Sequence, residues 1–346
     1  MKLIKVLITG AGSGVGQSII KALRISSIPV KIISADIHPL NAGLYRTDQA
    51  IIVPKVEDKN TLAWYLKNLK KSQIDILMVG SEYDLTFFSK NKNIIEKKTK
   101  CLVCVADIET VKISEDKYLT QDFFRKNKLP YLKTFIPKSI KDAENISKKI
   151  GLPVFLKGRF GTSSRNVHLI KTLDQIKIFY PSVRKPIIQE YAGYYGDGLD
   201  YEFTCSYFTT KQNKFIGPFV ARRKLLHGTS WVTEVDKFPR IRPIIKKIST
   251  LLSNTGSLNI QLRIGPKGIF PFEINARFSG TTSIRAHFGF NEPEMFIKSY
   301  LLNKKIKNPK IRKGMSLRYI EEIFIENKNY KNITEKFGKG KINKWF

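Results

Sequence analysis

Cysteine, acidic residues and long apolar runs are all scarce in this sequence. Three Cys among 346 residues are too few for a disulfide scaffold and fit a reducing compartment. No apolar run approaches the roughly 18 residues of a membrane-spanning helix, so we expect no membrane span. The opening MKLIKVLITGAG resembles a signal peptide only until Lys5 and the glycines interrupt its apolar run. We therefore expect a cytoplasmic protein.

The shortage of acidic residues leaves a strongly basic chain. There are 29 Asp and Glu against 61 Lys and Arg, a net charge of +32. Nucleic-acid-binding proteins share such an excess. Here, however, 46 of the basic residues are Lys, spread along the whole chain among abundant Ile and Asn, a mixture that biased codon usage can produce. The composition favours a solvated surface that also attracts anionic substrates, with nucleic-acid or membrane-surface binding as the alternative.

Length and apolar content predict a globular protein of two or three domains. The hydrophobic fraction is 42% and the aromatic fraction 11%, which excludes a mainly disordered chain. In the first hundred residues, short β-rich runs alternate with helical patterns, which predicts a parallel sheet covered on both faces, a Rossmann-like α/β unit. The expected strands are 3–9, 30–36, 51–54, 75–80 and 101–106, and the expected helices are 16–25, 61–71 and 85–98.

The sequence changes character after this unit. Helical patterns at about 115–127 and 139–149 lead to short strands at 153–157 and 166–172. From residue 186 onward, strands follow one another until a helix near 239–253 and a hairpin pattern at 257–277. Successive strands without intervening helices predict an α+β region built on an antiparallel sheet.

A glycine-rich loop, TGAGSGVG (9–16), lies between the first strand and the first helix. Such a loop can turn backbone N–H groups and a helix N-terminus toward an anion. Asp36 ends the next strand, where dinucleotide-binding folds place an acid against the ribose. The glycines equally suit a tight turn with close packing. An NAD(P)-dependent Rossmann oxidoreductase or epimerase is thus an alternative function, although it leaves the second half unexplained.

The hairpin at 257–277 carries the clearest chemical pattern. If its strands pair symmetrically about Lys267, Gln261 lies opposite Glu273 and Asn259 opposite Asn275. Residues two apart share a face, so Gln261, Glu273 and Asn275 would project together. Their side-chain oxygens suit Mg²⁺ shared with phosphate oxygens, and Arg277 continues the face. A half-buried sheet with its polar residues outward is the plainer explanation.

Other motifs accompany the hairpin. Lys157 abuts a Gly/Ser loop that contains Gly161, Ser163 and Ser164, and such a pair can hold a triphosphate by charge and backbone donors. Lys117 in ISEDKYLT is a second phosphate-ligand candidate. Further candidates are Glu190 and Tyr191, which precede the flexible GYYGDG, then Asp200 and Glu202, two apart on one strand face, and Arg223 in the basic stretch ARRK.

In combination, these motifs resemble the ATP-grasp superfamily. The order DK, GLPVFLKGRFGTSS, IIQEY, NIQLR and FEINARFSG is similar to its carbamoyl-phosphate-synthase-like and biotin-carboxylase-like branch. The front segment, with VLITGAGSGVGQSIIKAL, SADIHPLNAGLY and GSEYDL, resembles the pre-ATP-grasp domain of that branch. The resemblance covers about residues 1–303. It implies a Rossmann-like domain over 1–113, an ATP-grasp domain over 114–303 with a small lid at about 130–188, and a basic C-terminal extension over 304–346.

The resemblance also implies roles for individual residues. Gln261, Glu273 and Asn275 match the metal ligands, with Glu273 bridging two Mg²⁺ ions, or Mn²⁺ in their place. Arg277 matches the arginine that steadies the transferring phosphoryl group. ATP would be held by Lys117, Lys157, Gly161, Ser163 and Ser164 at the phosphates, by Glu190 and Tyr191 at the adenine, and by Asp200 at the ribose. Because GDGLDYEF departs from the family pattern there, Glu202 is the fallback.

The implied activity is that of an ATP-dependent carboxylate–amine ligase. A carboxylate is phosphorylated to an acyl phosphate, an amine displaces the phosphate to give an amide, and ADP and phosphate are released. Both substrates would be small molecules, and Arg223 would reach the acceptor or the acyl phosphate. Ser81, Glu82 and Asp84 would hold the amine or cap the next helix. The tail at 314–326 is expected to add a strand, which would complete the sheet or support a homodimer.

Overall fold

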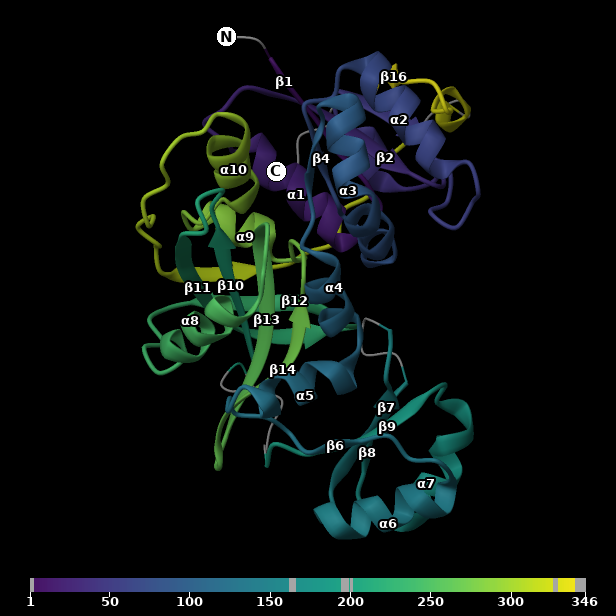
Figure 1. Ribbon diagram of the computed structural model, residues 1–346, viewed down its shortest axis with the longest axis vertical. Helices are drawn as coiled ribbons and strands as arrows, with labels where there is room; N and C mark the ends of the chain where they lie inside the picture. The colour runs from purple at the N-terminus through teal and green to yellow at the C-terminus, as the bar shows by residue number, and fades with distance from the viewer. Residues whose placement is uncertain (1–2, 162–165, 194–198, 200–201, 326–328, 340–346) are drawn as a thin grey trace.

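The computed structural model describes residues 3–161, 166–193, 199, 202–325 and 329–339. The described strands form three sheets, two of six strands and one of four. Figure 1 shows the first sheet and its helices at one end, the second sheet in the middle and the small third sheet at the other end. No helix within the described ranges is long and apolar enough to cross a membrane.

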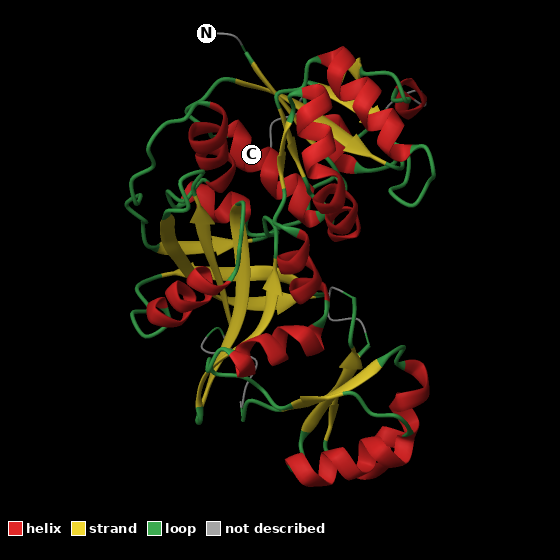
Figure 2. Ribbon diagram, in the orientation of Figure 1, coloured by secondary structure: helices red, strands yellow, loops and turns green. Residues whose placement is uncertain are grey.

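The first sheet contains the five predicted parallel strands, in the order β3-β2-β1-β4-β5. Val6, Leu7 and Ile8 are each at most 1% exposed, because helices cover both faces of the sheet (Figure 2). The strands are β1 Ile4–Ile8, β2 Val30–Asp36, β3 Gln49–Ile52, β4 Ile76–Met78 and β5 Leu102–Cys104, and the helices are α1 Gly14–Arg24, α2 Thr61–Ser72 and α3 Leu85–Thr99.

The second sheet is antiparallel and has the order β14-β13-β10-β11-β12-β15. One face is apolar and packs on α5 Lys117–Lys126 and α8 Arg242–Leu251. The opposite face carries the polar residues of the candidate site. The strands are β10 Glu202–Thr209, β11 Phe215–Leu226, β12 Thr229–Val235, β13 Gly256–Gly265, β14 Gly268–Asn275 and β15 Gly314–Leu317.

The third sheet forms a small lobe with a core of its own, which confirms the predicted lid subdomain. Its order is β6-β9-β7-β8, all antiparallel. Two helices, α6 Ile140–Ile150 and α7 Leu173–Phe179, cover one side of it (Figure 1). The strands are β6 Thr134–Phe135, β7 Val154–Gly158, β8 Val167–Ile170 and β9 Pro186–Glu190.

The structure differs from the sequence predictions at several elements. The helix expected over about 115–127 is α5, which begins at Lys117 because Asp116 is extended and caps it. We did not predict α4 Ile108–Glu115, which precedes it. We did not predict β12, α7, α9 Thr282–His287 or α10 Glu292–Phe296. In the tail, β15 pairs with β12, so the predicted added strand is confirmed. The short β16 Gly338–Lys339 instead pairs with β3 of the first sheet.

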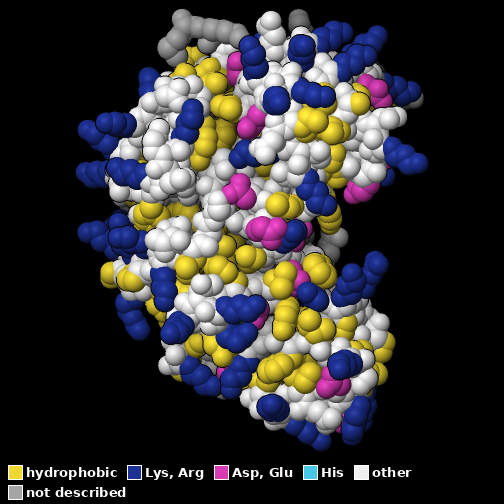
Figure 3. Space-filling view, viewed as in Figure 1, with side chains coloured by type: hydrophobic (Ala, Val, Ile, Leu, Met, Phe, Trp, Pro, Cys, Tyr) yellow, Lys and Arg dark blue, Asp and Glu magenta, His cyan; other side chains and the backbone are white. Residues whose placement is uncertain are grey.

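On the face seen in Figure 3, the basic residues do not gather on one stripe. Figure 3 shows Lys and Arg side chains spread over the whole visible face, with the few acidic side chains between them. This distribution agrees with a solvated, Lys-rich surface.

Candidate active site

The hairpin of β13 and β14 brings the three predicted metal ligands together. Gln261 pairs with Glu273, and Asn259 pairs with Asn275. The Nε2 of Gln261 donates to Oε1 of Glu273 at 3.3 Å, and the Nδ2 of Asn275 donates to the same oxygen at 3.0 Å. The predicted juxtaposition of these side chains is therefore confirmed.

The predicted symmetric register is right at the site and wrong nearer the turn. The pairing shifts between Gln261 and Leu262, so that Leu262 lies opposite Pro271 and Gly265 opposite Gly268. Pro271 lacks an N–H, but β14 is an edge strand, where a proline costs little. A β-bulge at this point changes the register without turning the site residues to the other face.

Lys157 is the penultimate residue of β7 and is 7% exposed. Its Nζ donates to Oε1 of Gln189 on the neighbouring strand β9 at 2.7 Å. Burial, helped by the positive charge of Lys117, lowers the pKa of Lys157 from 10.5 to about 7. A triphosphate would offset that burial with negative charge, so the environment of this amine suits an anionic ligand.

Lys117 is the first residue of α5 and approaches the Gly/Ser loop from the other side. Its Nζ donates to the carbonyl of Gly161 at 2.6 Å. Asp116 caps α5 and also pairs with Arg159, whose Nη2 lies 2.6 Å from Oδ2. Burial lowers the pKa of Lys117, and the carboxylate of Glu273 opposes that change. Lys117 therefore lies close enough to both Gly161 and the hairpin carboxylate Glu273 to interact with each.

Ser163, Ser164 and Asp200 lie outside the described residues. Glu190 ends β9, where its N–H donates to the carbonyl of Lys133 at 2.8 Å. Its carboxylate accepts from the N–H of Lys133 at 3.1 Å, so the side chain fixes the strand to the segment before β6. The ring of Tyr191 packs edge-on against Phe155.

Arg223 is buried and joins two candidate residues. Its Nη2 donates to Oε1 of Glu202 at 2.8 Å and to Oε1 of Gln261 at 2.7 Å. Arg263 donates to the other oxygen of Glu202 at 2.6 Å. Burial raises the pKa of Glu202, but the two guanidinium groups outweigh it and the net change is downward. Sequence reasoning missed that Glu202 is already held by two arginines and that Arg223 contacts a candidate metal ligand.

Arg277 connects the hairpin to the first domain. Its Nη2 donates to Oδ1 of Asn275 at 3.1 Å and forms an ion pair with Glu82, in the loop between β4 and α3. Its Nη1 donates to the carbonyl of Phe278 at 2.7 Å. Burial lowers the pKa of Arg277. The GSEYDL segment thus lies against the end of the candidate metal face, as a substrate contact there would require.

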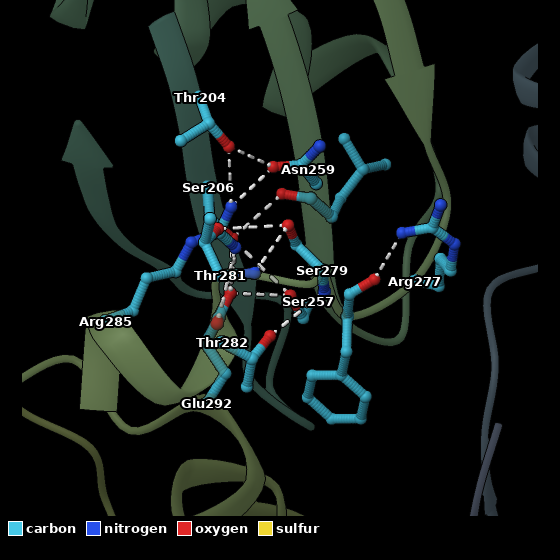
Figure 4. A network of polar contacts seen from close by, with 12 residues as sticks. Thr204, Ser206, Ser257, Asn259, Arg277, Ser279, Thr281, Thr282, Arg285 and Glu292 are labelled. Carbon is cyan, nitrogen blue, oxygen red and sulfur yellow. Dashed lines mark hydrogen bonds and ion pairs between the residues drawn. The ribbon is translucent and has the colours of Figure 1, made fainter. Parts of the chain in front are cut away.

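A second polar network, which the sequence analysis missed, lies on the same face of the sheet (Figure 4). Arg285 of α9 is fully buried and pairs with the fully buried Glu292 at 3.1 Å. It also donates to Thr204 at 3.0 Å and to Asn259, which pairs with Asn275. The available signal was the spacing of Thr204, Ser206, Ser257 and Asn259, because polar residues two apart on adjacent strands require a polar partner.

The glycine loop is explained by packing. A Cβ on Gly16 would lie 2.3 Å from the carbonyl oxygen of Gly10, so only glycine fits there. The carboxylate of Asp36 accepts from the N–H of Gly12 at 2.7 Å and from Nδ2 of Asn41 at 2.6 Å. Because the loop itself occupies the carboxylate that a ribose would need, these contacts disfavour the dinucleotide-binding alternative.

The donor set fits Mg²⁺. Glu273 supplies carboxylate oxygens, and the amides of Gln261 and Asn275, whose oxygens now accept from Arg223 and Arg277, would supply theirs by rotating. Lys117 and Lys157 provide charge for the phosphates that would complete the coordination. Across the described part of the chain, no three His, Cys, Asp or Glu side chains gather where they could hold a metal. A site with one carboxylate therefore depends on a ligand that brings its own negative charge.

Two family models match the chain. Residues 200–323 match "ATP-grasp in the biosynthetic pathway with Ter operon", and residues 6–103 match "PylC-like, N-terminal domain". The first match contains the whole hairpin and the second contains the glycine loop. Residues 200–323 thus match an ATP-grasp family. No curated protein matches it in sequence.

Solved ATP-grasp structures have the same fold. N5-carboxyaminoimidazole synthetase from Staphylococcus aureus, complexed with ADP, superposes with a TM-score of 0.71 at 13% identity, over 92% of this chain and 81% of that one. The biotin carboxylase domain of 2-oxoglutarate carboxylase from Hydrogenobacter thermophilus, complexed with MgADP, ADP and bicarbonate, has a TM-score of 0.69 at 13% identity, over 90% and 73%. The Aspergillus clavatus synthase, complexed with ADP and 5-aminoimidazole ribonucleotide, has a TM-score of 0.70 at 13% identity, over 91% and 81%.

These similarities confirm the predicted ATP-grasp fold with its Rossmann-like first domain. At 13% identity they establish architecture only. The roles of individual residues in this chain rest on its own geometry.

Proposed function

We propose that the protein is an ATP-dependent ligase that joins a carboxylate to an amine. The observation that carries this proposal is the convergence of Gln261, Glu273 and Asn275 on one sheet face. The ATP-grasp fold and its solved relatives with bound nucleotide support it.

The nucleotide phosphates would lie between the hairpin and the lid. Lys157 and Lys117 would hold them from the lid strand and from α5, and Glu273, Gln261 and Asn275 would hold Mg²⁺. Bound Mg²⁺ would supply positive charge to the phosphate oxygens during transfer. The lid, with a core of its own, would close over the nucleotide and exclude water.

The reaction would proceed in two balanced steps. A carboxylate oxygen of the first substrate attacks the γ-phosphorus, the bond to the β–γ bridging oxygen breaks, and ADP leaves. The amine nitrogen then attacks the acyl carbon, phosphate leaves, and the nitrogen loses a proton to give the amide. Arg277, beside Asn275, would face the transferring phosphoryl group.

The amine would enter from the side of the first domain. Glu82 already meets Arg277 there, and its carboxylate can accept hydrogen bonds from an ammonium group. Burial raises the pKa of nearby Asp84 to about 6, so this loop also offers a carboxyl that can change protonation near neutral pH. These contacts support the GSEYDL segment as the acceptor side.

Several details of the proposed site and of the protein's assembly stay predictions. They include two bound ions, Mn²⁺ as a substitute, the contacts of Ser163, Ser164 and Asp200, the domain boundaries, a homodimer and a cytoplasmic location.

The test is a screen of small carboxylates paired with amines for ADP release, with the wild type and Glu273→Ala. We expect Glu273→Ala to lose about a hundredfold or more in turnover, because it removes the only carboxylate among the three proposed ligands. Glu109→Ala, which removes an exposed carboxylate from α4, is the matched control and should keep its turnover. Near-wild-type turnover of Glu273→Ala with unchanged folding would contradict the proposal.

A further inference from the structure

The segment that precedes β15 concentrates positive charge. Six of its ten residues, 304–313, are Lys or Arg and none is acidic. All six side chains are exposed. In Figure 1 this basic segment runs along the outer side of the molecule beside α10. Four of its cations form no ion pair with any described residue: Lys304, Lys305, Lys307 and Lys310.

The basic segment is held against the body of the protein. Ile306 is 9% exposed and packs into the core beneath the first sheet. The side-chain oxygen of Asn308 accepts from the N–H of Gly217 at 2.8 Å. The N–H of Arg312 donates to the carbonyl of Phe288 at 2.9 Å. These anchors at three points keep the lysines between them on one fixed surface.

Directly after the basic segment, the chain exposes a cluster of large apolar side chains. Of the nineteen such side chains that are exposed among the described residues, six lie between Met315 and Ile325. Leu317 is 69% exposed, Ile320 78% and Phe324 81%. Exposing this much aliphatic and aromatic surface in one short stretch marks an interaction site.

The apolar cluster and the basic segment meet at one cavity. This cavity, of about 910 Å³, lies between α1 and α9, and Leu317 and Ile320 line it. His287 and Phe288 line the same cavity, and their carbonyls accept from Arg312 at the end of the basic segment. None of the proposed nucleotide or metal ligands lines it. The two features are therefore neighbours in space, and the proposed ligase reaction uses neither.

The combination of cations with exposed aliphatic side chains selects among partners. A nucleic acid would match the cations and leave the aliphatic side chains in water, because it offers phosphates and bases. In a symmetric dimer the same surface meets itself. Residues 304–325 carry seven basic and two acidic residues, so each copy would bring a net charge of +5 to that contact. An anionic lipid bilayer satisfies both features, because its headgroups attract cations and its interface takes up apolar side chains.

We propose that the surface formed by residues 304–325 binds an anionic lipid bilayer and holds the protein at the membrane–water interface. The lysines of the basic segment would lie against lipid phosphates, and Leu317, Ile320 and Phe324 would enter the interface. The lid lies at the opposite end of the molecule from α10 in Figure 1, so a bilayer bound here leaves the lid in water. The proposal does not depend on the ligase reaction.

Flotation of the full chain with lipid vesicles tests this proposal. One set of vesicles contains phosphatidylcholine and phosphatidylglycerol in equal parts, and the other contains phosphatidylcholine alone. We expect the protein to float with the anionic vesicles and not with the neutral ones. High salt should release most of it, because salt screens the attraction between the lysines and the lipid phosphates.

Two variants separate the charged and the apolar contributions. A fourfold variant replaces the unpaired lysines of the basic segment by Gln, and it should bind anionic vesicles about a hundredfold more weakly or less, because each lysine near such a surface is worth about fivefold in affinity. Ile320→Ser should weaken binding by about tenfold, the contribution of one aliphatic side chain leaving water. The matched control removes four exposed lysines from α2 and α3 and should keep most of its affinity: Lys70, Lys71, Lys97 and Lys98.

Equal binding to neutral and anionic vesicles, or equal losses in the fourfold variant and its control, would overturn the proposal. So would binding of a DNA duplex that needs the four lysines while vesicles stay unbound, or a dimer in sedimentation that does not float. If the fourfold variant fails to fold by circular dichroism, Ile320→Ser decides, and unchanged vesicle binding there contradicts the proposal. ATP binding is titrated in the same samples, and a wild type that floats without binding ATP would contradict the ligase alone.

Discussion

At the scale of single residues, the site depends on how one carboxylate is surrounded. Glu273 accepts hydrogen bonds from the amides of Gln261 and Asn275, while Gln261 is held by Arg223 and Asn275 by Arg277. Each amide that donates to Glu273 is thus fixed from its other end by an arginine. In this arrangement the amide oxygens face the arginines and the NH2 groups face Glu273, so Gln261 and Asn275 would have to rotate their amides to present oxygen to an ion.

Lys157 should make ATP binding depend on pH. Its pKa is about 7 in the free protein, and a bound triphosphate would raise it toward the ordinary value of 10.5. Between these values the complex holds a proton that the free protein lacks, so binding takes up a proton and affinity falls as pH rises above about 7, by up to about tenfold per pH unit. Below pH 7 the amine is charged in both states and the dependence disappears.

Calorimetry at pH 8 in two buffers of different ionisation enthalpy measures this uptake. Lys157→Arg is the control, because a guanidinium stays charged in both states. Proton uptake of the same size in Lys157→Arg would assign the effect to another group.

At the scale of elements, the network in Figure 4 holds α9 and α10 to β10 and β13, on the same sheet face as the candidate metal ligands. Arg285 and Glu292 are both 0% exposed, and Ser257 donates to Glu292 at 2.6 Å. Removing one residue of the pair leaves a buried charge without its counterpart. Removing both leaves no buried charge, and only the neutral hydrogen-bonding groups around the pair lose their partners.

We therefore expect Arg285→Met to lower the free energy of unfolding by about 3–5 kcal/mol. The double variant Arg285→Met with Glu292→Met should be less destabilised than the single variant. Urea unfolding measures both. Glu292→Met is measured as the second single variant. If the double variant loses as much stability as Arg285→Met and Glu292→Met together, the two residues do not act as a pair.

Local sequence patterns predicted the elements that depend on residues close together in the chain. The hairpin has alternating residues on both sides of a Gly-Pro-Lys-Gly turn, and its site register was predicted correctly. The β-bulge after Gln261 was missed. A shift of one residue in the pairing of β13 and β14 does not change the alternation of polar and apolar residues along either strand, so the sequence pattern does not reveal it. The start of α5 was predicted to within two residues, and Asp116 before it is a favoured N-cap residue, whereas α4 was missed.

At the scale of the whole molecule, the tail connects the two domains. β15 extends the second sheet, β16 extends the first, and Glu321 pairs with Arg46 of the first domain. Ile333 is 5% exposed in the core beneath the first sheet. Pairing between β16 and β3 joins segments almost 300 residues apart, and no local pattern specifies such a contact. The sequence therefore predicted a strand in the tail but not its connection to the first domain.

If the tail is part of the folded core, Ile333→Ala should lower the free energy of unfolding by about 2–5 kcal/mol, the usual range for replacing a buried isoleucine with alanine. Ile320→Ala, in the same tail but 78% exposed, should change stability by less than about 0.5 kcal/mol. Thermal or urea unfolding followed by circular dichroism compares the two. Equal, small effects would mean that the tail packs only loosely on the first domain.

The central claim is that a nucleotide binds at the hairpin with Mg²⁺, and calorimetric titration with ATP tests it most directly. The wild type and Glu273→Ala would each be titrated with and without Mg²⁺, and NAD(P)H would be titrated in parallel. We predict that ATP binds the wild type tightly, that binding weakens without Mg²⁺ or without Glu273, and that NAD(P)H does not bind. Binding of NAD(P)H without binding of ATP would contradict the account and make the glycine loop the site.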